Sequence, residues 1–291
     1  MSIKQELYDV FARLLTAGVF GSTLPGINAW RYITEVEPAH IEVTELRLPI
    51  RGLSSAFAGL RLAQISDIHI GSFINRERLE RAAELALSAR PDYILLTGDY
   101  LPGYGWSPQR ETQLEDLAAG LRSLTSARPT FYILGNHDHR INARAVRAAL
   151  DGIGAIDLNN SVYPIESGPN KLYLAGVDDY NVGKARLDLV LRQLPTDGPA
   201  ILLAHEPDFA DISAATGRFA LQISGHTHGG QIVLPFIGPP LLPRYGWKYP
   251  SGLYQVGQMY QYTNRGIGTG AHEIRYNCRP EITVIVLEPA A

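Results

Sequence analysis

Histidine, aspartate and asparagine gather in five short polar blocks of this sequence. The blocks read SDIHIGS (66–72), TGDY (97–100), GNHDH (135–139), AHEP (204–207) and GHTHGG (225–230). Imidazole, carboxylate and amide groups form a mixed nitrogen and oxygen donor set, which suits zinc, manganese, iron or cobalt. Each block alone is a weak signal: an aspartate in a turn often caps its own backbone, and a single histidine is often a core residue. The chemistry depends on whether the blocks meet.

Each polar block directly follows a short apolar run, which favours one meeting place. The runs LAQI, YILL, FYIL, AILL and LQIS are typical of buried strands. In the first half of the chain they alternate with amphipathic helices predicted over 76–89, 109–125 and 142–150, the pattern of βαβ units. Because ligands of α/β sheets bind at the carboxyl ends of the strands, the five blocks are expected at one sheet edge.

The second half of the chain is richer in strands. Strands are predicted over 171–177, 200–205, 220–226, 253–257 and 282–287, in addition to 41–50 and 60–65 near the start. Two sheets packed face to face, with helices outside, would bury all of these apolar runs. The 291 residues are expected to form one α/β domain over 38–291, preceded by an N-terminal segment over 1–37.

Composition excludes several classes of protein. With 45% hydrophobic and 19% charged residues, the chain is expected to fold. A net charge of −3 lacks the excess of lysine and arginine that general nucleic-acid binders use, so stable nucleic-acid binding is not expected. Cys278 is the single cysteine, which rules out an internal disulfide and a thiolate metal cluster.

Two apolar segments suggest contact with a membrane. Residues 14–30 are uncharged but are interrupted by glycine and proline, and they fall short of the roughly 20 apolar residues that span a bilayer. We expect 1–37 to be a peripheral anchor, with a helix packed on the domain as the alternative. The proline-rich segment 232–250 is a second candidate for lipid contact, unless it packs on the second sheet. The expected location is peripheral at the cytoplasmic membrane, with a soluble cytoplasmic protein as the alternative.

The order of the five blocks resembles a known family. D-x-H, G-D, G-N-H-D, a single histidine and G-H-x-H after successive strands are similar to the calcineurin-like metallophosphoesterase superfamily. The resemblance extends from about residue 40 to the end of the chain. SDIHIGSF, GHTHGGQ and RPEITVIVL are most similar to the YaeI/YkuE-type phosphodiesterases within it. This resemblance implies a four-layer α-β-β-α sandwich of two mixed β-sheets.

The resemblance also implies two divalent metal ions held by seven side chains. The ligands of one ion are Asp67, His69 and His228, those of the other are Asn136, His205 and His226, and Asp99 bridges the two. His137 would face the substrate, oriented by Asp138. A hydroxide between two such ions is a strong nucleophile, because metal binding lowers the pKa of water from about 15.7 towards 7.

The expected activity is therefore a metal-dependent phosphoesterase, most of all a phosphodiesterase. An alternative is a lipid-linked pyrophosphatase, such as the UDP-2,3-diacylglucosamine hydrolase of lipid A synthesis, suggested by the two apolar segments. A protein phosphatase or nuclease is less favoured, and a non-catalytic scaffold least, because no ligand is missing. Arg140, Arg265 and Arg275 are candidates for binding the substrate phosphate, with solvated surface charge as the alternative.

Overall fold

Two β-sheets pack face to face in the computed structural model, which describes residues 29–103, 105–270 and 272–290. The first sheet has the strand order β1 (Glu42–Ile50), β12 (Glu281–Pro289), β2 (Arg61–Ile65), β3 (Tyr93–Leu96), β4 (Thr130–Tyr132) and β5 (Ile156–Asp157). The second has the order β10 (Gly252–Val256), β11 (Met259–Thr263), β9 (Leu221–Ser224), β8 (Ala200–Leu203), β7 (Asn170–Gly176) and β6 (Ser161–Ser167).

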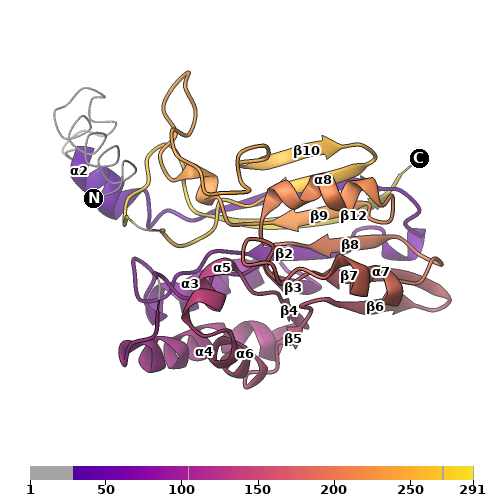
Figure 1. Ribbon diagram of the computed structural model, residues 1–291, viewed down its shortest axis with the longest axis horizontal. Coiled ribbons are helices and arrows are strands. Elements are labelled where there is room, and N and C mark those ends of the chain that lie inside the picture. The colour runs from indigo at the N-terminus through magenta and orange to yellow at the C-terminus, as the bar shows by residue number, and fades with distance from the viewer. Residues whose placement is uncertain (1–28, 104, 271, 291) are drawn as a thin grey trace.

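Both sheets are mixed. β2 to β5 run parallel, and β12 joins them antiparallel to β2 while pairing in parallel with β1. In the second sheet β7, β8, β9 and β11 run parallel, and the edge strands β6 and β10 are antiparallel to their neighbours. Residues that follow β2, β8 and β9 contact one another, so the carboxyl ends of these strands lie at the same end of the sandwich (Figure 1).

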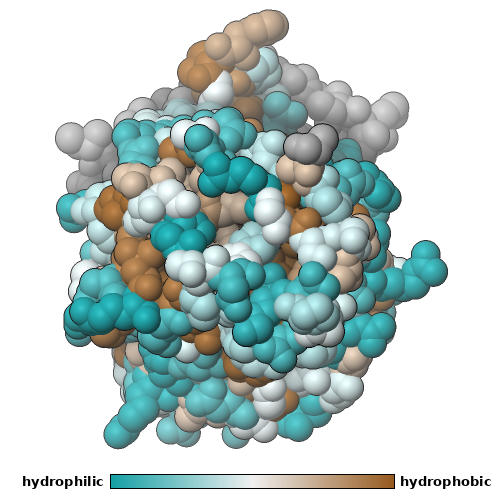
Figure 2. Space-filling view, turned by 90° about the vertical axis from the view of Figure 1, so that its right-hand side faces the viewer, coloured by the Kyte–Doolittle hydropathy of each residue, from teal (hydrophilic) through white to brown (hydrophobic). Residues whose placement is uncertain are grey.

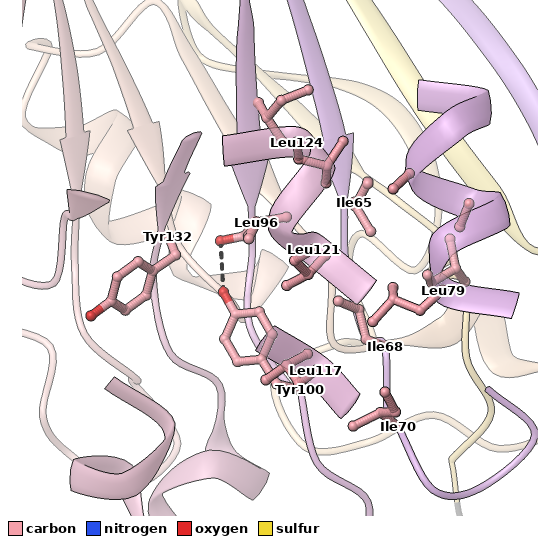
Figure 3. Packing of buried hydrophobic residues seen from close by; sticks show 14 of the residues in the cluster. Ile65, Ile68, Ile70, Leu79, Leu96, Tyr100, Leu117, Leu121, Leu124 and Tyr132 are labelled. Atoms are coloured by element: carbon pink, nitrogen blue, oxygen red, sulfur yellow. Dashed lines mark hydrogen bonds between the residues drawn. The ribbon is translucent and has the colours of Figure 1, made fainter. Parts of the chain in front are cut away.

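Helices cover the outer face of each sheet (Figure 1). Those on the first sheet are α3 (Arg76–Ser88), α4 (Gln109–Ala127) and α6 (Ala143–Asp151), and those on the second are α7 (Leu187–Gln193) and α8 (Ala210–Ala215). Leu79 of α3 and Leu121 of α4 pack towards Ile65 of β2 (Figure 3). A separate buried cluster fills the space between the sheets, with Leu95 from one and Leu203 from the other. The expected α-β-β-α sandwich is thus the fold of this protein.

The shorter helical elements lie in the connections. They are α2 (Ala29–Arg31), η1 (Tyr32–Val36), η2 (Ser55–Phe57), α5 (Asn136–Ile141), η3 (Pro207–Phe209) and η4 (His228–Gly230). The sequence did not predict β5, β6, β11, α5, α7 or α8. The prediction missed β6 because it contains Pro164, and an edge strand tolerates a residue without a backbone N–H.

The apolar segment 14–30 lies almost entirely outside the described residues. No helix within the described part of the chain is long and apolar enough to cross a bilayer. Ile33 of η1 packs in a small buried cluster with Ile232, Leu234 and Ile274. The base of the 232–250 segment therefore packs against the start of the described chain.

Candidate metal centre

Five of the seven predicted ligands lie in strained turns. Positive φ angles occur at Asp67 (51°), His69 (47°), Asp99 (57°), His226 (72°) and His228 (53°). Residues with side chains rarely adopt this left-handed region, and such strain concentrates at functional sites. Because this conformation interrupts a strand, β9 ends at Ser224 although a strand is predicted over 220–226, whereas β2 ends at Ile65 as predicted. The side chains that follow these strands turn towards the sheet edge.

One group of predicted ligands meets between the two sheets. Asp67 and His69 follow β2 of the first sheet, and His228 follows β9 of the second. A ligand atom from each lies within 4.8 Å of the others, and all three side chains are buried. The His69 Nε2 and His228 Nε2 atoms are 3.1 Å apart, and His228 Nε2 is 3.5 Å from Asp67 Oδ1.

A second group lies beside the first. Ligand atoms of Asp99, His205 and His226 also lie within 4.8 Å of one another, and all three residues are buried. His205 Nε2 is 3.2 Å from Asp99 Oδ2 and 3.3 Å from His226 Nδ1. The same Oδ2 of Asp99 is 3.8 Å from His69 Nε2 in the first group. Asp99 therefore lies between the two groups, as a bridging ligand must.

Backbone carbonyls orient three of the imidazole rings. His69 Nδ1 lies 3.1 Å from the Leu101 carbonyl oxygen, and His205 Nδ1 lies 2.7 Å from that of Thr97. His226 Nε2 lies 2.8 Å from the carbonyl oxygen of Arg244. A carbonyl only accepts hydrogen bonds, so these ring nitrogens donate, and in the neutral rings the opposite nitrogens face the centre with a lone pair.

Asn136 contributes an amide to the second group. One amide atom lies 3.0 Å from His226 Nδ1, and the other lies 2.8 Å from Arg140 Nη1. Hydrogen bonding alone favours the nitrogen towards the imidazole and the oxygen towards Arg140. A cation beside His226 would favour the reverse, with the oxygen as its ligand. Asn136 thus lies beside the second group, and the orientation of its amide would depend on whether a cation is bound.

Burial keeps most of these imidazoles neutral, which is the form that binds metal. It lowers the pKa of His69 to about 4 and, together with the charge of His205, that of His226 to about 3. Burial opposes charge on His205 too, but the adjacent Asp99 carboxylate raises its pKa well above the ordinary value. Asp99 and His205 therefore form a buried ion pair, and a cation binding here would displace the His205 proton.

The fit of these residues to a pair of cations is chemical as well as geometric. Burial raises the pKa of Asp67 to about 6, with the charge of Asp99 adding to the effect. His228 Nδ1 is buried and has no hydrogen-bond partner among the described residues. Buried carboxylates and imidazoles facing one another are costly unless a cation neutralises them. The donors contain nitrogen and oxygen and no thiolate, as the sequence predicts for zinc, manganese, iron or cobalt.

Two glycines of the last histidine block have different roles. A Cβ on Gly225 would lie 1.9 Å from Ser66 Oγ and 2.3 Å from Asp67 Oδ2. The absence of a side chain at Gly225 therefore lets the turn before His226 approach the turn that carries Asp67. Gly229 has φ +60°, in the left-handed region that glycine adopts readily.

His137 lies next to the centre but belongs to neither ligand group. Its backbone N–H donates to Asp99 Oδ1 over 2.9 Å, and its ring lies edge-on to His69 with 5.1 Å between centroids. The ring atom Nδ1 is 2.7 Å from the Gly103 carbonyl oxygen. This leaves the ring at the wall of a cavity, where a substrate would meet it.

Asp138 has different contacts from those the sequence suggests. Its buried carboxylate accepts hydrogen bonds of 2.9 Å from the backbone N–H groups of Asp99, Tyr100 and Gly135. These donors use both carboxylate oxygens, and the His137 ring is held by Gly103 instead. The prediction that Asp138 orients His137 directly is therefore not supported. Asp138 joins the turns that carry Asp99 and Asn136.

Comparison with known proteins decides the family. The sequence model of the calcineurin-like phosphoesterases matches residues 60–230, a range that holds all seven predicted metal ligands. The chain belongs to this family. Metallophosphoesterase YkuE of Bacillus subtilis (strain 168), described as uncharacterized, is 33% identical over 282 residues, which cover 95% of this phosphoesterase and 97% of YkuE.

Two further relatives differ in how much of their own length the match covers. Phosphodiesterase YaeI of Escherichia coli (strain K12) is 28% identical over 269 residues, covering 91% of this chain and 95% of YaeI. A transmembrane protein with a metallophosphoesterase domain from Danio rerio is 30% identical over 267 residues, covering 86% of this chain and 58% of that protein. This phosphoesterase is accordingly a metal-dependent hydrolase of phosphoric ester bonds.

A cavity of about 420 Å³ opens onto the centre of this phosphoesterase. Its wall includes Asp99, Asn136, His137, Arg140, His226 and His228 from the predicted set. Two further polar residues of the wall, Asn181 and Arg244, were not singled out from the sequence, whereas the apolar side 241–243 belongs to the segment 232–250 that was proposed for lipid contact. Neither residue stands in a polar block after a strand that carries a ligand, so spacing offered no signal for them.

Arg265 and Arg275 lie away from this cavity wall. Arg275 is fully buried and donates to the backbone carbonyls of Arg265, Gly266, Gly268 and Cys278. Arg265 pairs with Glu281 and Glu42. Both guanidinium groups thus hold the C-terminal loop of this phosphoesterase in place, and the predicted contact of Arg275 with a substrate phosphate is not supported. Of the three predicted arginines, Arg140 alone lines the cavity.

Proposed function

We propose that this protein is a phosphodiesterase with a dinuclear metal centre. The observation that carries the proposal is Asp99, whose Oδ2 lies 3.2 Å from His205 Nε2 and 3.8 Å from His69 Nε2, between two three-residue ligand groups. When bound, two divalent ions supply an activated water nucleophile and neutralise the phosphoryl oxygens. The similarity to a protein named as a phosphodiesterase supports a diester as substrate.

The residues around the ligands have separate roles in this proposal. His137 donates a proton to the leaving alkoxide or a hydrogen bond to the phosphoryl group, since its ring reaches the cavity and the Gly103 carbonyl fixes its Nδ1. Arg140, at the same wall, binds a phosphate oxygen. Asp138 keeps the turns of Asp99 and Asn136 at a constant spacing through its three backbone hydrogen bonds.

Elemental analysis combined with a substrate panel tests this function. We expect about two equivalents of transition metal per chain, as a two-metal site requires. Hydrolysis of bis(4-nitrophenyl) phosphate should exceed that of 4-nitrophenyl phosphate, a phosphopeptide and plasmid DNA. Protein without bound metal, or protein that prefers the monoester, the peptide or DNA, would contradict the phosphodiesterase proposal.

A lipid-linked substrate, cleaved at a diester or a pyrophosphate, is the second candidate. The cavity has an apolar side formed by Leu241, Leu242 and Pro243. In the same segment Phe236 and Ile237 are exposed to 109% and 75%, in a turn held by hydrogen bonds to the Leu234 carbonyl. The turn stands off the body in Figure 1, and an apolar protrusion rises at the same place in Figure 2. This geometry suits a protein that rests peripherally on a membrane, with 1–37 as a further contact.

Flotation of the full chain with anionic phospholipid vesicles tests the membrane contact. We expect binding by the wild type and its loss in the double variant Phe236→Ser and Ile237→Ser. Ile212→Ser is the matched control, because Ile212 is 40% exposed on α8 and outside this turn. Equal flotation of all three proteins would refute a role for the turn. Failure to cleave UDP-2,3-diacylglucosamine would refute the pyrophosphatase alternative.

A further inference from the structure

Arg244 lies at the rim of the cavity, in a loop fixed to the metal centre. Its backbone carbonyl accepts the hydrogen bond from His226 Nε2 over 2.8 Å. The main chain at Arg244 therefore moves with a predicted metal ligand. Its side chain is exposed and lines the cavity together with Arg140, Asn181 and the apolar side 241–243.

An aromatic stack holds the guanidinium of Arg244. Its Cζ atom lies 4.4 Å from the centroid of the Tyr245 ring, within the range of a cation–π contact. The ring centroids of Tyr245 and Tyr180 are 4.7 Å apart, and the Tyr180 ring packs edge-on against the buried ring of Phe209. The side chain is thereby restrained before a ligand arrives, which lowers the entropy lost on binding.

The charges on the cavity wall favour an anion at this rim. In the described part of the wall, two residues carry a guanidinium group and one, Asp99, carries a carboxylate, which is a predicted metal ligand. Among the described residues no carboxylate forms an ion pair with Arg244. A simple phosphodiester carries one negative charge, which the metal ions and Arg140 already meet. Arg244 is therefore suited to a second anionic group of the substrate.

We propose that Arg244 is a specificity-determining residue that binds a second phosphate of the substrate, beside the phosphodiester that is cleaved. The inference rests on the proposed phosphodiesterase function and narrows its substrate class to diesters that carry a further phosphate. A guanidinium binds such a group through two parallel hydrogen bonds, which a lysine cannot reproduce.

A matched pair of chromogenic substrates tests this role. Thymidine 5'-(4-nitrophenyl phosphate) and its 3'-phosphorylated form share the scissile bond and the leaving group and differ only in the second phosphate. We expect the wild type to favour the 3'-phosphorylated form about tenfold in kcat/KM, the effect of one charge-assisted contact. Arg244→Ala should abolish this preference, Arg244→Lys should keep part of it, and Arg122→Ala, on the exposed face of α4, should keep all of it.

Two further measurements separate the possible causes. Elemental analysis should find the same metal content in wild type and Arg244→Ala, since the backbone carbonyl that binds His226 remains. Isothermal titration calorimetry compares the binding affinities of thymidine 3',5'-bisphosphate and thymidine 5'-monophosphate, which tests the contact with the second phosphate without turnover. The role of Arg244 would be overturned if Arg244→Ala lowered kcat/KM equally for the two chromogenic substrates, or if the wild type showed no preference between them. Metal-loaded protein that cleaves neither substrate would overturn the phosphodiesterase function itself.

Discussion

The Nε2 atoms of His69 and His228 lie 3.1 Å apart, although 159 positions separate the two residues in the chain. His69 follows β2 in one sheet and His228 follows β9 in the other, so their contact joins the two halves of the sandwich. His69 presents a lone pair here because its Nδ1 donates to the Leu101 carbonyl. A cation between the two rings would therefore link the sheets as well as serve the chemistry.

Removal of metal should destabilise the fold. Dialysis against a strong chelator should lower the melting temperature by about 5 °C, since a ligand at 100 times its Kd contributes about 2.7 kcal/mol to the folded state. The ligands come from both sheets and are buried, and without a cation the carboxylates of Asp67 and Asp99 repel each other, which favours unfolding. Differential scanning calorimetry measures this change, and added zinc or manganese should restore the original melting temperature. An unchanged melting temperature after verified removal would contradict the predicted site.

Asp99→Asn should remove the bridge between the two metal positions. The amide has one neutral oxygen, whereas the carboxylate has two oxygens that share a negative charge. At least one equivalent of metal should therefore be lost. Hydrolysis of bis(4-nitrophenyl) phosphate should fall by about 100-fold or more. Metal content and kcat are measured on the same preparation, with Glu115→Gln on the exposed surface of α4 as control. Two retained equivalents with full activity would exclude a bridging role for Asp99.

His137→Ala should impair catalysis without loss of metal. A general acid contributes about 10²- to 10⁴-fold, and most to substrates whose leaving group is poor. We expect a large fall in kcat for an alkyl diester and a smaller one for bis(4-nitrophenyl) phosphate, whose leaving group needs little protonation. Equal falls for the two substrates would instead indicate that His137 stabilises the phosphoryl oxygens.

Asp138→Ala should act mainly on stability. The substitution leaves three buried backbone N–H groups without their acceptor, at Asp99, Tyr100 and Gly135. The free energy of unfolding should fall by about 3 kcal/mol, measured by urea denaturation of metal-free protein. Comparison with metal-free Glu115→Gln, whose exposed side chain should contribute little, isolates the effect. Unchanged stability with a loss of kcat would favour the role that the resemblance implies, in which Asp138 orients His137.

Arg275→Ala should also lower stability, in contrast to a substrate-binding role. Its guanidinium donates to four backbone carbonyls within the fully buried interior of the C-terminal loop. We expect a loss of about 3 kcal/mol in urea denaturation, against little change for exposed Arg122→Ala. A stable variant with a raised KM would show that the sequence-based prediction was right after all.

Much of the fold follows from local properties of the sequence. Apolar runs such as YILL and AILL predict buried strands because their residues must avoid water, and the polar residues directly after them predict a shared edge. The ends of these strands were less predictable. The strand predicted over 200–205 ends at Leu203, and β3 ends at Leu96, because the turns that aim His205 and Asp99 at the centre begin there.

The sequence by itself determined which side chains are suited to bind metal, since donor chemistry belongs to each residue and their order along the chain matches one family. Tertiary structure alone decided that Asp138 ties two turns together, that Arg275 is buried and that Arg244 faces the cavity. The physical reason is that a hydrogen bond or a cavity wall requires groups within a few ångströms. Which distant segments come that close depends on the packing of both sheets and is absent from any local pattern.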